Sequence, residues 1–214
     1  MRSQLVVSLS GIGTRTADRC ADLAAELDRR HVPLSLLVAP RELGQAQGWV
    51  RERAGNGDAL LLHGLGGRRV PAHEANLLLT GARRAMETLG LDADCFAPRC
   101  SIASPGTLTA LRRHRFSLCA DAVAVRDLRT GTEQNGKVHA LGDRVESLRC
   151  LALVYSAGRT ARRGGLVRIA VDAADLDRIG PRQAVLDAVD AALSHAAVPT
   201  TYVRLPSPRR ASAA

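Results

Sequence analysis

Residues 5–40 read LVVSLSGIGTRTADRCADLAAELDRRHVPLSLLVAP and predict a strand, a helix and a second strand. The runs at 5–10 and 33–40 are apolar and end at glycine or proline, as short strands do. Between them, apolar residues recur at helical spacing after a threonine that can act as N-cap, which predicts a helix over 17–30. Two strands joined by a helix are typical of parallel neighbours in one sheet.

The same alternation continues to the end of the chain. Further strands are predicted at 58–64, 95–98, 116–121, 150–157, 165–172 and 198–205, and further helices at 45–56, 71–89, 105–114 and 181–196. The polar stretch 126–147 is expected to be a loop with fragments of structure. Seven or so parallel strands over this length predict an α/β fold, a small and imperfect (β/α) barrel, with an open doubly wound sheet as the alternative. We expect one domain over 1–205 and a disordered tail at 206–214.

Composition restricts the compartment and the cofactors. The five cysteines include no CxxC pair, which is typical of reduced thiols. The N-terminal apolar run is too short for a signal peptide, and no run reaches the length of a membrane span, so we expect a cytoplasmic protein with no membrane partner. Gly11-Ile12-Gly13 lacks the third glycine of a dinucleotide fingerprint, which argues against a nucleotide cofactor.

The net charge of +9 is carried by arginine, because Lys137 is the only lysine. Arginine clusters at 112–115 and 159–163 could bind a nucleic acid or another polyanion. Biased use of arginine in place of lysine gives the same composition, and an aromatic content of 2% leaves few rings on which bases could stack. Nucleic-acid binding is therefore not favoured, and Arg159, Arg162 and Arg163 are expected to face solvent.

Functional residues of such a fold lie where strands end at their carboxyl edge. The residues at these positions are Ser8, Ser10, Pro40, Arg41, His63, Pro98, Arg99, Asp121, Ser156 and Asp172. His63 follows a buried run, so it is either a core histidine or a ligand of substrate or metal. Asp172 can act as a general acid or base, or it can cap the turn over 173–176.

Several of these segments resemble the polysaccharide deacetylase superfamily. The resemblance rests on VSLSGI at 7–12, His63-Gly64 after DALLL, and FAP at 96–98 with SPGTL at 104–108. It covers about 4–205 and is closest to a branch of unknown function found in actinobacteria. The resemblance implies a metal-dependent de-N-acetylase barrel, in which one aspartate and two histidines bind a divalent ion that activates water.

The match to the family's motifs is partial. Ser8-Leu9-Ser10-Gly11 stands where the family has a carboxylate pair, and Gly67 stands where its second histidine follows the one matched by His63. His73 is the nearby histidine that could substitute for it. Ala97-Pro98-Arg99 approximates the arginine-and-proline motif, and no histidine lies near Val171-Asp172, where the family has its general acid.

The resemblance therefore implies a degenerate site. His63 and His73 are the candidate metal ligands, and Asp172, Ser8 and Ser10 the candidate catalytic residues. Pro98, Arg99 and Trp49 are the candidates for substrate binding. Hydroxyls are poor ligands for a divalent ion, so weak or absent Zn²⁺ binding is expected. Three functions stay open: hydrolysis of an acetamido group on a carbohydrate, a catalytically inactive barrel that binds a carbohydrate or another small molecule, and arginine-driven polyanion binding.

Overall fold

The computed structural model describes residues 2–65, 70–99, 102–141 and 146–205. Its strands are β1 (Gln4–Ser10), β2 (Leu34–Val38), β3 (Ala59–Gly64), β4 (Cys95–Pro98), β5 (Leu118–Ala120), β6 (Ala124–Asp127), β7 (Glu133–Asn135), β8 (Val138–Ala140), β9 (Leu166–Asp172) and β10 (Val198–Thr200). Its α-helices are α1 (Ala17–Asp28), α2 (Gln47–Gly55), α3 (Ala72–Thr88), α4 (Pro105–Arg113), α5 (Glu146–Arg162) and α6 (Ile179–Ser194). Short 3₁₀-helices lie at Gly44–Ala46, Asp175–Asp177 and Tyr202–Arg204.

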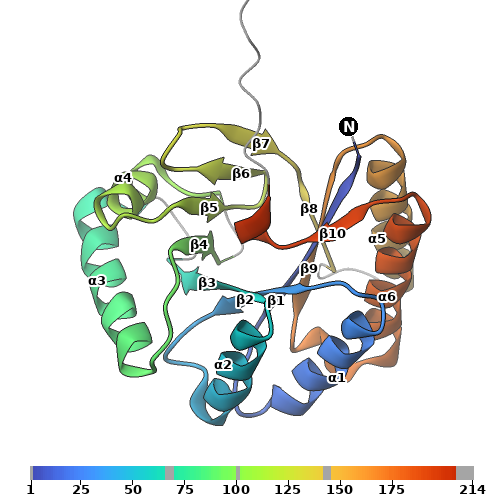
Figure 1. Ribbon diagram of the computed structural model, residues 1–214, viewed down its shortest axis with the longest axis horizontal. Helices are drawn as coiled ribbons and strands as arrows, with labels where there is room; N and C mark the ends of the chain where they lie inside the picture. Colours follow the sequence, from blue (N-terminus) through green and yellow to red (C-terminus); the bar gives the residue numbers. More distant parts are fainter. Residues whose placement is uncertain (1, 66–69, 100–101, 142–145, 206–214) are drawn as a thin grey trace, which may run out of the picture.

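The strands form one sheet in the order β7-β6-β5-β4-β3-β2-β1-β9-β8, and β10 pairs with β1 (Figure 1). The β5–β6 and β6–β7 pairs are antiparallel and the other pairs are parallel. The two edge strands, β7 and β8, are consecutive in the chain. Their connection lies against the turn after β5, where the Gly136 N–H donates to Val123 O (2.9 Å) and the Val138 N–H donates to Ala122 O (3.0 Å). We call this contact the seam, and it makes the sheet the imperfect barrel that the sequence predicts.

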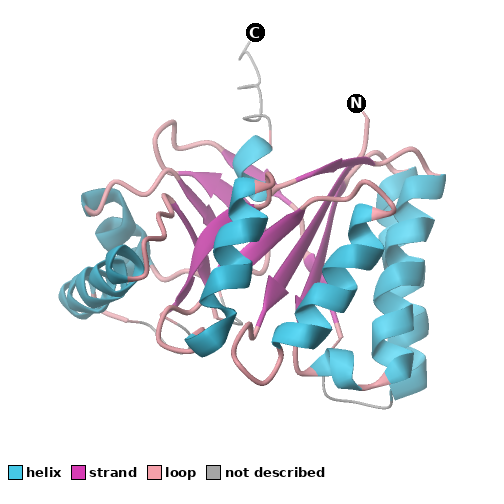
Figure 2. Cartoon of the chain, turned by 60° about the horizontal axis from the view of Figure 1, so that its bottom comes forward, coloured by secondary structure: helices cyan, strands magenta, loops and turns pink. Residues whose placement is uncertain are grey.

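The helices lie outside the sheet, with α3 and α4 on one side and α5 and α6 on the other (Figures 1 and 2). Alternate residues of each strand face opposite sides, which separates two cores. On β1, Leu5, Val7 and Leu9 pack with the outer core beneath the helices, whereas Val6 packs with the inner core inside the barrel. Side chains at every second strand position therefore fill the barrel and line its open end.

One predicted strand is wrong. The run CLALVYSA at 150–157 belongs to α5, which packs against α6. Its β-branched and aromatic residues favour a strand, but the buried hydrophobic residues described for α5 are Leu153, Ala157 and Ala161, at a spacing of four. That spacing is helical, and Leu151 and Tyr155 are exposed.

The strand predicted at 198–205 is also too long. Strand β10 ends at Thr200, and the 3₁₀-helix that follows places Tyr202 in the inner core with 2% of its surface exposed. The expected loop at 126–147 contains β7, β8 and the end of β6, and 142–145 lie outside the described residues, as does the tail at 206–214. No helix within the described ranges is both long and apolar enough to cross a bilayer.

The side chains of Arg159, Arg162 and Arg163 are exposed at the end of α5, as expected. We therefore expect Arg162→Gln to change the free energy of unfolding by no more than about 0.5 kcal/mol, as is usual for a surface site. Urea denaturation measures it. A loss of cooperative folding would mean that Arg162 belongs to a structural network.

Candidate functional site at the open end of the barrel

The carboxyl ends of the parallel strands surround a cavity of about 540 Å³, which we call the mouth cavity. Its lining includes Ser8, Ser10, Glu42, His63, Ala97, Pro98, Arg99, Ala120, Asp121, Lys137, Ala170, Arg168, Asp172 and Tyr202. Strand pairing fixes this arrangement, since Ser8 lies opposite Ala170, Ser10 opposite Asp172, and His63 opposite Ala97. The sheet thus brings together residues that are up to about 190 positions apart in the chain.

Six of the candidate residues line this one cavity: Ser8, Ser10, His63, Pro98, Arg99 and Asp172. This confirms the expectation that the ends of these strands meet on one rim. His73 does not line the cavity, because it lies in the first turn of α3 with an exposed side chain. Trp49 packs on the outer core from α2, so it does not offer its indole to a ligand in the mouth cavity.

His63 is held in a defined orientation near the end of β3. Its Nδ1 lies 3.0 Å from Ala97 O on β4. A carbonyl only accepts hydrogen bonds, so Nδ1 carries the proton and Nε2 keeps its lone pair. Burial lowers the pKa of His63, and the Arg99 guanidinium adds to this, although the bond to Ala97 opposes it. At neutral pH the mouth cavity therefore contains a neutral imidazole with Nε2 available as an acceptor.

The two serines at the end of β1 donate to the neighbouring strand β9. Ser8 Oγ donates to Ile169 O (3.4 Å), and Ser10 Oγ lies 3.3 Å from Val171 O and 3.2 Å from Asp172 Oδ2. Asp172 Oδ1 accepts the Ala174 N–H (2.9 Å), which is the capping contact considered for this residue. Gly11, with a φ of +70°, leaves room for it, because a Cβ there would lie 2.7 Å from Asp172 Oδ1.

At the rim, Arg99 pairs with Glu42 (Nη2–Oε1 2.6 Å). Both side chains are about half exposed, at 47% and 52%, so solvent screens the pair and it contributes little to stability. The same two residues and His63 also line a second cavity of about 420 Å³, which extends to Leu77 and Leu78 on α3. The Arg99–Glu42 pair therefore stands between two adjoining hollows.

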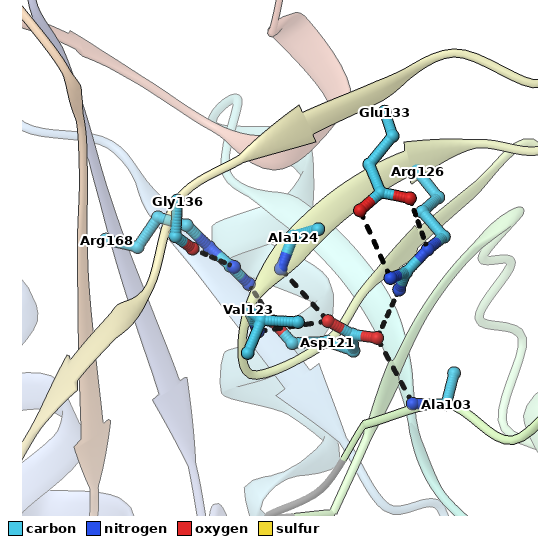
Figure 3. Close-up of polar contacts among 8 residues, drawn as sticks. All are labelled: Ala103, Asp121, Val123, Ala124, Arg126, Glu133, Gly136 and Arg168. Atoms are coloured by element: carbon cyan, nitrogen blue, oxygen red, sulfur yellow. Dashed lines mark hydrogen bonds and ion pairs between the residues drawn. The ribbon is translucent and has the colours of Figure 1, made fainter.

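Asp121 fixes the turn after β5 (Figure 3). Its side chain is fully buried, accepts the N–H groups of Ala103 (3.2 Å), Val123 (3.0 Å) and Ala124 (3.0 Å), and pairs with Arg126. Arg126 also pairs with Glu133 of β7 (2.9 Å). Although Asp121 lies at a strand end, as predicted for functional residues, its contacts hold one side of the seam in place.

Arg168 and Tyr202 form the floor of the mouth cavity, and sequence reasoning missed both. Arg168 lies in the middle of β9, and only 1% of its surface is exposed. Its position could have been inferred from the period of two, because residues 166, 168, 170 and 172 of one strand share a face. An arginine within such an apolar run is the feature of the sequence that marks this position as a candidate for the cavity.

The lining of the mouth cavity does not fit a tetrahedral divalent metal. Such a site needs three protein donors, commonly imidazole and carboxylate. His63 supplies one, Asp172 already caps a turn, and the hydroxyls of Ser8 and Ser10 face carbonyls of β9. Within the described residues, no three His, Cys, Asp or Glu side chains are grouped so that they could hold a metal ion. Gly67 lies outside the described residues.

The lowered pKa of His63 has a measurable consequence. Its folded-state pKa lies below that of the unfolded chain, about 6.5, so the unfolded state takes up the proton first as the pH falls. We expect the wild-type protein to lose stability relative to His63→Gln as the pH drops below about 6.5. NMR titration, with the His63 signal assigned by its absence from that variant, should give a pKa below the ordinary value. A pKa at or above that value would contradict the buried, neutral imidazole.

No protein-family model and no curated protein matches the sequence. Solved structures do match the fold. An allantoinase superposes with a TM-score of 0.69 at 12% identity, covering 94% of this chain and 88% of that one. A family 4 acetyl xylan esterase from Clostridium thermocellum, in complex with a cobalt ion, gives 0.62 at 11%, covering 94% and 88%. A mutant of a pseudoenzyme of the same esterase family, with restored activity, gives 0.61 at 9%, covering 92% and 64%.

At these identities the likeness shows the fold alone. Active enzymes and a pseudoenzyme share it, so the fold does not decide the activity of this chain. The chain has the α/β half-barrel, with mostly parallel strands, of the family 4 carbohydrate esterases and polysaccharide deacetylases.

Proposed function

We propose that this chain binds a carbohydrate or a related small polar molecule in the mouth cavity, without metal-dependent hydrolysis of an acetamido group. The observation that carries the proposal is the lining of the cavity. Polar groups converge at the carboxyl ends of the strands, where this fold has its sites, but they do not make up a metal-ligand set. The function of the chain is then that of a deacetylase-like binding barrel.

The size and chemistry of the cavity support a small ligand. A volume of about 540 Å³ is within the usual range for small-molecule sites, and it accommodates a mono- or disaccharide. His63 Nε2 can accept a hydrogen bond from a ligand hydroxyl, and Arg99 and Lys137 can donate. The carbohydrate class is suggested by the solved structures of the same fold, which include an acetyl xylan esterase and a polysaccharide deacetylase.

Titration with N-acetylglucosamine and its β-1,4 disaccharide in EDTA tests this proposal. In ¹⁵N-resolved NMR spectra, we expect saturable shifts at residues of β1, β3, β4 and β9 that line the mouth cavity. Ala170→Leu should abolish them, because the larger side chain fills the cavity next to Ser8. Ala152→Leu, at an exposed position on α5, makes the same change away from the cavity and should leave binding intact. Binding that requires zinc, or that survives Ala170→Leu, would contradict the proposal.

We further propose that the chain functions in the cytoplasm. Cys20, Cys95 and Cys119 are buried and unpaired, and burial raises the pKa of their thiols, to about 11 for Cys20 and about 12 for the other two. Thiols of this kind are unreactive and suit a reducing compartment. Recovery of the native protein from a secreted fraction with oxidised thiols would contradict this location.

A further inference from the structure

The floor of the mouth cavity contains a buried cation whose protein partners are all neutral. Arg168 donates from Nε to the Tyr202 hydroxyl (3.0 Å), from Nη1 to Gly136 O (2.6 Å) and from Nη2 to Asp121 O (2.6 Å). Its guanidinium also stacks over the Tyr202 ring at 5.2 Å. None of these groups carries a negative charge.

Part of this arrangement is structural. Asp121 and Gly136 lie on opposite sides of the seam, so Arg168 joins the two edges of the barrel from within. This role uses three of the five N–H donors of a guanidinium. The other two N–H groups, and the proton of the Tyr202 hydroxyl, have no acceptor among the described residues. Donors left over at the floor of a cavity are suited to a ligand that accepts hydrogen bonds.

The absence of a counter-ion for Arg168 among the described residues also favours a ligand that carries negative charge. Three carboxylates line the cavity: Glu42 pairs with Arg99, Asp121 pairs with Arg126, and Asp172, four residues further along β9 than Arg168, accepts the Ala174 N–H and keeps its charge at the strand end. Within the described part of the chain, no carboxylate forms an ion pair with Arg168 or with Lys137, which also lines the cavity. A buried charge without a counter-ion is unfavourable, so a ligand that supplies negative charge is stabilised there.

We infer that the ligand of the mouth cavity carries a carboxylate, which lies against Arg168 and the Tyr202 hydroxyl. This inference rests on the proposed function and specifies the chemical class of the ligand, such as a uronic acid. Two N–H groups and one O–H group match the acceptors of a planar monoanion. A phosphate dianion would need a second buried cation beside Arg168, and Lys137, which precedes the β8 residue paired with Arg168, is exposed.

The test compares D-glucuronate with D-glucose, which differ by a carboxylate in place of a hydroxymethyl group, with inorganic phosphate as a third probe. NMR titration of the whole chain should show that glucuronate binds at least tenfold more tightly than glucose, and that salt weakens this preference. Equal affinity for the two sugars would overturn the inference but leave the proposed function standing. Tighter binding of phosphate would overturn the choice of carboxylate, and failure of all three probes to bind would contradict the proposed function itself.

Single substitutions test where the carboxylate of the ligand binds. Tyr202→Phe keeps the ring under the guanidinium but removes one donor, and it should reduce glucuronate affinity several-fold and glucose affinity by less, so that the preference for glucuronate falls. Lys137→Gln changes an exposed residue that cannot affect the core, and it should weaken glucuronate binding to a smaller extent. Arg162→Gln makes a comparable charge change on α5 and serves as the control. An unchanged preference for glucuronate in Tyr202→Phe would show that the carboxylate does not lie at the floor.

Discussion

Asp121→Asn should lower the free energy of unfolding by about 3 to 5 kcal/mol, the cost typical of breaking a buried ion pair. The carboxylate is fully buried and accepts three backbone N–H groups in addition to its contact with Arg126. An asparagine supplies one acceptor oxygen in place of two, and its amide directs N–H groups at a donor. Since these contacts hold the turn that forms one side of the seam, the variant should also loosen the barrel there. Urea denaturation followed by circular dichroism measures the loss.

Asp177→Asn is the matched control. Asp177 pairs with Arg19 at 2.7 Å, but the two side chains are 64% and 40% exposed, so the loss should stay below about 1 kcal/mol. If Asp121→Asn cost no more than this control, the ion pair at the seam would not be a stabilising element of the fold.

The second large effect concerns catalysis. In the presence of zinc, deacetylation of N-acetylated chitin oligosaccharides by this chain should stay at the background rate. A metal-bound hydroxide and Lewis-acid assistance are worth several kcal/mol, which corresponds to a rate on the order of 10³-fold or more below that of a metal-dependent enzyme. Among the described residues, His63 is the one imidazole that lines the mouth cavity, and Ser8 and Ser10 are neutral. Release of acetate, assayed in zinc and in EDTA, measures this difference.

The assay needs a control for ligand binding by the same sample. N-Acetylglucosamine shifts recorded under identical conditions show that the cavity is intact when no acetate is released. A zinc-dependent rate that disappears in His63→Ala would mean that the chain is an active deacetylase.

Much of the fold could be predicted from the sequence, because the strands are short apolar runs separated by helical patterns. The ends of β1, β3, β4 and β9 were placed correctly on one rim from this alternation. The run CLALVYSA contains residues that favour strands, whereas the helical spacing of Leu153, Ala157 and Ala161 in α5 depends on small alanines, one of which lies beyond this run. The seam could not be predicted, since it is formed by tertiary contacts between the turn after β5 and residues 136–138.

Some residues of the candidate site could also be predicted from the sequence, and others could not. Residues at strand ends were found because their position follows from chain direction alone. Arg168 and Tyr202 were missed, since a residue in mid-strand reaches a cavity only when it faces inward, and the turn that brings Tyr202 inside the barrel interrupts a predicted strand. His73 is a candidate ligand by residue type, but the start of α3 leaves its side chain exposed.

Calorimetric titration of zinc into the metal-free protein, repeated with His63→Ala, tests most directly whether the barrel has kept a ligand cavity without a metal site. We predict weak binding without a defined stoichiometry, and no difference between the two proteins, because one imidazole with two hydroxyls does not form a coordination set. Tight binding of one zinc ion per chain that His63→Ala abolishes would contradict this view and identify the mouth cavity as a metal centre.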